Sequence, residues 1–128
     1  SAASDVYKRQ DMQKAAQMMM EMGAKSVVIK GGHLTGEEAA DVLFDGKSFM
    51  TFVSPRIDTK NTHGTGCTFS SAIAANLANG MARAEAVKAA KRYITGAIAH
   101  ALPIGHGHGP THHFYSLYKK GGFEGMTR

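Results

Sequence analysis

Apolar side chains recur three and four residues apart in three stretches of the chain, and this spacing is typical of helices that bury one face. The three stretches cover residues 11–22, 67–79 and 83–102. A residue that ends helices follows each of them: Gly23, Gly80 and Pro103. Residues 1–10 and 119–128 show no periodicity of either kind, and we expect both segments to be tails.

A different pattern predicts strands between the first two helices. Residues 26–29 form a short apolar run, which is typical of a strand in a parallel sheet that is covered on both faces. Residues 39–44 and 47–53 flank Asp45-Gly46, a pair that favours a hairpin with a type I′ turn, in which both central residues have positive φ. The order of elements therefore predicts an α/β fold with an added antiparallel hairpin.

Composition narrows the classes of function. The 128 residues allow one domain or part of one. The net charge of +5 favours an anionic partner, yet the 15 Lys and Arg are scattered, which argues against a nucleic acid and for a small phosphorylated ligand. No apolar run approaches the roughly 18 residues that span a membrane. The single cysteine excludes an internal disulfide framework and makes the reducing cytoplasm the expected compartment.

The segment with the clearest chemistry precedes the second predicted helix. Gly64 and Gly66 let the backbone fold tightly, and an apolar helix begins directly behind them. The free N–H groups of residues 64–67 would then converge at the positive end of the helix dipole, where an anion binds without any side chain. A phosphoryl group in transfer gains most from donors that are fixed in advance. No Gly-Lys-Ser or Gly-Lys-Thr follows, so the segment is not a P-loop.

The side chains of Cys67 and Lys30 each lie next to glycines, and each has two interpretations. Cys67 would lie in the first turn of the helix, where its thiolate could accept the proton of a substrate hydroxyl. A small buried side chain at a crowded helix start explains the same cysteine without chemistry. Lys30 follows the predicted strand 26–29 and precedes a glycine pair, so it either contacts a ligand or lies in solvent at the end of a strand.

The histidines near the end of the chain invite a metal interpretation, because His-x-His and His-His pairs can chelate. These histidines are His106, His108, His112 and His113. No cysteine or carboxylate accompanies them, so we predict no metal site and expect a Gly/His loop that packs near the ligand pocket.

Three motifs occur in a recognisable order: Lys-Gly-Gly-His at 30–33, Asn-Thr-His-Gly-Thr-Gly-Cys-Thr at 61–68, and Gly-His-Gly-Pro followed by His-His-Phe within 107–114. Together they resemble the hydroxymethylpyrimidine (phosphate) kinases of thiamine biosynthesis, a family within the ribokinase-like superfamily. The resemblance covers residues 11–118. The cysteine is the most specific element, because most of the superfamily resembles Gly-x-Gly-Asp at this point.

The resemblance implies a role for each motif residue. Cys67 would be the catalytic base, and with it Gly64, Thr65 and Gly66 would form the anion hole. Lys30 would lie near the ATP phosphates, and Thr62 and His63 would line the approach to the anion hole. The implied reaction is ATP-dependent phosphorylation of a small pyrimidine alcohol, and then of its monophosphate.

The resemblance also sets expectations for the fold and for what lies outside the chain. It implies the C-terminal part of a ribokinase-like domain, with a mostly parallel sheet flanked by helices and a hairpin. Ligands for Mg²⁺ are expected in the N-terminal half of the family fold, so this chain alone is expected to have little turnover. A pyridoxal or pyridoxine kinase and a non-catalytic ligand-binding fragment remain alternatives. A homodimer is possible, because dimers are common in the family.

Overall fold

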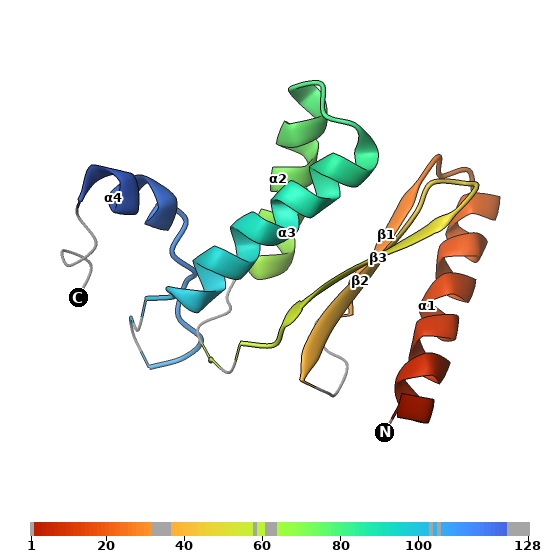
Figure 1. Cartoon of the computed structure of the whole chain (residues 1–128), viewed down its shortest axis with the longest axis horizontal. Coiled ribbons are helices and arrows are strands. Elements are labelled where there is room, and N and C mark those ends of the chain that lie inside the picture. The colour runs from red at the N-terminus through yellow and green to blue at the C-terminus, as the bar shows by residue number, and fades with distance from the viewer. Residues whose placement is uncertain are drawn as a thin grey trace. The chain divides into compact units, whose positions relative to one another are not determined.

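The computed structural model describes residues 2–31, 37–57, 59–60, 64–102, 104 and 106–122, with side chains from residue 9 onward. They fall into two compact units, Ser1–Arg56 and Ile57–Arg128. The first unit contains α1 (Ala2–Glu21), β1 (Val27–Ile29), β2 (Glu38–Phe44) and β3 (Phe49–Pro55), and the second contains α2 (Thr65–Ala78), α3 (Arg83–Ala99) and α4 (Tyr115–Gly121) (Figure 1). No helix within the described ranges is both long and apolar enough to cross a bilayer.

Helix α1 is longer than the apolar spacing predicts. It begins at Ala2, so most of the segment 1–10, which we expected to be a tail, is helical. That segment contains Ala, Lys, Arg and Gln and lacks Gly and Pro, so helix propensity extends α1 without an apolar face. The predicted C-terminal end is confirmed, because α1 stops at Glu21 and Gly23 follows with a φ of 105°. Met12 and Ala16 are the buried side chains of this helix.

The strands of the first unit form a three-stranded sheet in the order β1-β2-β3. The predicted hairpin is confirmed, since β2 and β3 pair antiparallel along their whole lengths. Strand β1 also pairs antiparallel with β2, with Ile29 opposite Val42, although its apolar run is typical of parallel sheets. The connection over residues 30–37 explains the difference, because a parallel crossover needs about a dozen residues or more. Within the described residues, every ladder of this sheet is antiparallel.

The turn of the hairpin differs from the type I′ turn that Asp45-Gly46 predicts. Gly46 has a φ of 94°, but no non-glycine residue of the described chain has a positive φ, which excludes type I′ geometry at Asp45. The Asp45 carboxylate instead accepts the backbone N–H groups of Lys47 and Ser48, each at 2.8 Å. A short side chain that bonds ahead to the backbone is a common way to fix a turn.

In the second unit, helices α2 and α3 lie side by side (Figure 1). Both were predicted from the apolar spacing, and both are confirmed with ends shifted by a few residues. Helix α3 buries the long side chain of Lys91 together with a stripe of mostly small apolar side chains: Ala86, Val87, Ala90, Ile94 and Ala97. Small side chains let two helices approach closely, and the Asn76 amide of α2 also donates to the Ala86 carbonyl at 3.0 Å.

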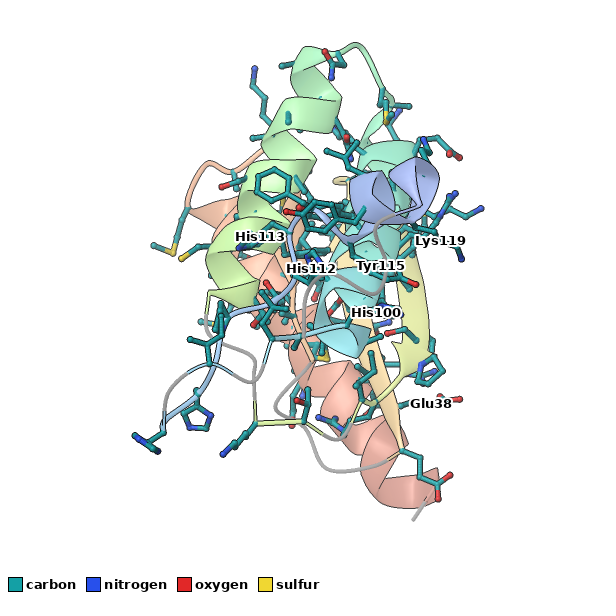
Figure 2. The ribbon with its side chains drawn as sticks, turned by 90° about the vertical axis from the view of Figure 1, so that its left-hand side faces the viewer. Glu38, His100, His112, His113, Tyr115 and Lys119 are labelled. Carbon is teal, nitrogen blue, oxygen red and sulfur yellow. The ribbon has the colours of Figure 1, made fainter. Side chains whose placement is uncertain are left out.

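The C-terminal segment folds back onto the end of α3. The His112 N–H donates to the Ala97 carbonyl at 2.9 Å, and the Leu102 N–H donates to Pro110 at 3.0 Å. The His100 ring stacks on Tyr115 of α4 with centroids 3.4 Å apart (Figure 2). The sequence did not indicate helix α4, because its seven residues are too few to show a helical repeat.

Candidate active site

The site begins with the backbone conformation of Gly64, the residue that precedes helix α2. Gly64 is the N-cap and adopts the left-handed conformation, with φ 79° and ψ 6°. The Thr68 N–H donates to the Gly64 carbonyl at 2.9 Å, and this is the first hydrogen bond of the helix. The N–H groups of residues 65–67 come before that bond, so none of them has a partner within the helix. The donors that the sequence predicted are therefore present at the start of α2.

The surroundings of these donors suit an anion. Gly64, Gly66 and Cys67 are exposed, and Thr65 is half-buried. No acidic side chain lies in the first turn of α2, so no carboxylate of the helix itself competes for its positive end. The Ser70 hydroxyl donates back to the Gly66 carbonyl at 3.0 Å, which directs it along the helix and away from the N–H groups.

Cys67 carries the only nucleophilic sulfur of the chain. It is a free thiol and it is exposed, so the alternative of a small buried side chain at a crowded helix start is wrong for this structure. Its backbone N–H is one of the three amides left free by the helix start. The exposed thiol and the amides without a partner in the helix therefore belong to the same few residues.

The predicted site residues are divided between the two units, and two of them lie outside the described residues. Lys30 directly follows strand β1 in the first unit and is exposed. Gly64, Thr65, Gly66 and Cys67 all lie in the second unit. Thr62 and His63 lie outside the described residues.

The Gly/His loop contacts the segment that precedes helix α2. The Nδ1 atom of His108 lies 2.7 Å from the carbonyl oxygen of Lys60, a residue only a few positions before Gly64. The contact joins the loop to the segment that precedes α2, and the expectation that the loop packs near the ATP-side pocket stays a prediction. In the described part of the chain, no three His, Cys, Asp or Glu side chains are arranged to hold a metal ion.

One buried acidic side chain was missed by the sequence analysis. Asp41 lies within β2, is only 4% exposed, and accepts the N–H of Gly31 at 3.0 Å. Its signal in the sequence is a carboxylate inside an apolar strand, where it has to be satisfied by hydrogen bonds or charges.

Comparison with known proteins identifies close relatives. The family model described as phosphomethylpyrimidine kinase matches residues 2–112, which includes residues that the sequence analysis left outside the resemblance. A thiamine biosynthesis bifunctional protein of Geobacter sulfurreducens is 53% identical over 110 residues, which cover 86% of this chain and 22% of that protein. A hydroxymethylpyrimidine/phosphomethylpyrimidine kinase of Rhizobium meliloti is 50% identical over 111 residues, which cover 85% of this chain and 42% of that kinase. The chain thus spans less than half the length of these relatives.

Solved structures show the same relationship. The ADP complex of a Bacillus subtilis pyridoxal kinase superposes with a TM-score of 0.80 and 46% identity, over 84% of this chain and 41% of that one. A Staphylococcus aureus pyridoxal kinase in complex with AMP-PCP and pyridoxal gives a TM-score of 0.79 and 37% identity, over 83% of this chain and 40% of that one. The likeness confirms the predicted α/β, ribokinase-like fold class.

Proposed function

The chain belongs to the phosphomethylpyrimidine kinase family, and on this premise we propose that it serves the ATP-dependent phosphorylation of hydroxymethylpyrimidine and its monophosphate in thiamine biosynthesis. The observation that carries the proposal is the open start of helix α2, where free amides and an exposed thiol occur together. The names of the curated relatives, which match most of this chain, support the choice of substrate.

The chemistry follows from the residues at the helix start. ATP supplies the phosphoryl group, and the alcohol oxygen of the pyrimidine forms the new P–O bond as the bond to ADP breaks. The N–H groups of Thr65, Gly66 and Cys67 hold the negative charge of the group in transfer. The Cys67 Sγ atom, as thiolate, accepts the hydroxyl proton. Each donor is set by the fold before the substrate arrives, so no rearrangement is needed at the moment of transfer.

Other parts of the proposal concern residues around this centre. Lys30 is assigned to the ATP phosphates, and Thr62 and His63 to the approach to the anion hole. Mg²⁺ would supply charge neutralisation for the phosphates in a kinase of this type. Among the described residues no group of three His, Cys, Asp or Glu could hold it, and its ligands are expected in the half of the family fold that this chain does not cover. We assign the protein to the cytoplasm, where its single thiol stays reduced. A homodimer is part of the proposal only by analogy with the family.

The decisive experiment removes the thiol in a complete kinase. We define the chimeric kinase as the Rhizobium meliloti enzyme with this chain in place of its matching segment. Cys67→Ala should lower kcat by roughly 10²- to 10⁴-fold, the usual contribution of a general base, while the KM for ATP stays unchanged. Ser71→Ala is the matched control, since it removes an exposed Oγ from the same helix. Unchanged turnover in Cys67→Ala would overturn the proposed role.

A second candidate activity has an observation in its favour, because solved structures similar to this chain include pyridoxal kinases. The test places the chain in two hosts, the Rhizobium meliloti pyrimidine kinase and the Staphylococcus aureus pyridoxal kinase. We expect turnover close to that of the parent in the pyrimidine kinase and a large loss in the pyridoxal kinase. The reverse order would favour phosphorylation of pyridoxal.

A further inference from the structure

Asp41 is a charged side chain in an unfavourable place. It occupies the middle of β2, beside the fully buried Val42, and only 4% of it is exposed. Burying a carboxylate costs free energy unless hydrogen bonds or opposite charges compensate for the lost water. The hairpin would form without it, because an apolar side chain fits a buried strand position better. A buried carboxylate here therefore calls for a specific task.

The hydrogen bond that Asp41 accepts identifies the segment on which it acts. Its Oδ1 atom accepts the N–H of Gly31 at 3.0 Å, and this hydrogen bond is buried. Gly31 directly follows Lys30, the cation assigned to the ATP phosphates. The hydrogen bond that holds the Gly31 amide therefore also fixes the orientation of the peptide group between Lys30 and Gly31.

The strand register shows why this peptide needs a side chain to hold it. The ladder between β1 and β2 ends at Ile29 opposite Val42, so Lys30 and Gly31 lie beyond the last paired residue. The same register continued by one step sets Lys30 opposite Asp41. The Asp41 carboxylate thus holds the Gly31 amide at the point where the chain leaves the sheet.

Gly31 is also packed closely against the neighbouring strand. A Cβ atom at this position would overlap the backbone carbonyl oxygen of Ala40 and would also touch the Met12 side chain. Only glycine permits this approach, and the close approach brings the Gly31 N–H within reach of Asp41. Glycine and carboxylate therefore act together to fix one path of the chain after Lys30.

We propose that Asp41 is a positioning residue for nucleotide binding: its carboxylate holds the Gly31 amide and thereby sets the direction in which Lys30 presents its ammonium group to the phosphates. The inference rests on the proposed function, specifically on the contact between Lys30 and ATP. No contact with substrate is assigned to Asp41, and its proposed effect on nucleotide binding passes through Lys30.

A double-mutant cycle in the chimeric kinase tests this dependence. Asp41→Ala should raise the KM for ATP by roughly tenfold, the factor expected from the loss of a hydrogen bond to a charged group. In a Lys30→Met background the same substitution should change the KM for ATP by no more than about twofold, because the side chain through which Asp41 acts is gone. Asp41→Asn keeps an oxygen that can accept the Gly31 N–H and should restore the wild-type KM. Asp45→Ala is the matched control, since it removes the carboxylate of the hairpin turn.

The outcomes distinguish the proposed contact of Lys30 with ATP from the proposed positioning role of Asp41. If Lys30→Met leaves the KM for ATP unchanged, the proposed role of Lys30 falls and the inference falls with it. If Lys30→Met raises that KM but Asp41→Ala changes it equally in both backgrounds, Asp41 is merely structural and only the inference falls. If Asp41→Ala does not fold, Asp41→Asn decides: a KM for ATP raised tenfold despite a Gly31 amide still protected from hydrogen exchange overturns the inference, and a normal KM with that protection supports it.

Discussion

Replacing Gly64 with alanine tests the start of helix α2, on which the proposed anion hole depends. Gly64 has a φ of 79°, and nothing lies within 4 Å of the place where a Cβ atom would stand. The added methyl group therefore meets no neighbour, and the whole cost comes from the left-handed backbone. For a residue other than glycine that cost is about 1–2 kcal/mol. The substitution should lower the stability of the second unit by this amount.

Thermal unfolding of the 128-residue chain, followed by far-UV circular dichroism, measures the effect. For a unit of the size of Ile57–Arg128, a loss of 1 kcal/mol lowers the midpoint by about 4–8 °C. Gly96→Ala is the matched control, because it adds the same methyl group inside α3, again with nothing within 4 Å. There the methyl group should raise stability by about 1 kcal/mol, since alanine favours the helix. The midpoint of thermal unfolding should therefore fall in Gly64→Ala and rise in Gly96→Ala.

Gly64→Asn adds a second comparison. Asparagine tolerates the left-handed conformation better than alanine, so it should lose less stability. If Gly64→Ala unfolds at the wild-type midpoint, or if asparagine is worse than alanine, the helix does not begin as the structure has it. The free amides of residues 65–67 would then lose their structural basis.

Three further predictions concern other parts of the chain. Gly31→Ala should destabilise the chain by about 1–3 kcal/mol, because its Cβ would overlap the Ala40 carbonyl, and an unchanged midpoint in urea would contradict that close approach. Thr111→Val removes a buried hydroxyl that has no hydrogen-bond partner among the described residues, so stability should stay equal or rise by up to about 1 kcal/mol; a clear loss in the same titration would mean that this hydroxyl is bonded. The 128-residue chain alone should show no phosphorylation of the pyrimidine alcohol in a coupled assay of ADP release, because it spans less than half of its relatives, and turnover equal to theirs would refute this.

The strands show which features of the fold follow from local sequence and which do not. The hairpin was predicted because Asp45-Gly46 separates two suitable runs, and these local signals do not depend on the rest of the fold. The partner of β1 was not predictable from its own residues, since a buried apolar run suits either direction of pairing. The direction of pairing instead follows from the connection over residues 30–37, which is too short for a parallel crossover. In helix α1 the apolar repeat covers only residues 11–22, and helix propensity extends the helix back to Ala2.

The sequence by itself determined the helices α2 and α3 and the hairpin, because each depends on contacts between residues close along the chain. The predicted helix began at Cys67, whereas α2 begins at Thr65 with Gly64 as its N-cap. The motif around Cys67 likewise pointed to the family, since its residue types and spacing can be read directly. Only the tertiary structure decided that Cys67 is exposed and that Asp41 holds Gly31. Exposure and the bond between Asp41 and Gly31 depend on which segments pack together, and no local pattern encodes that packing.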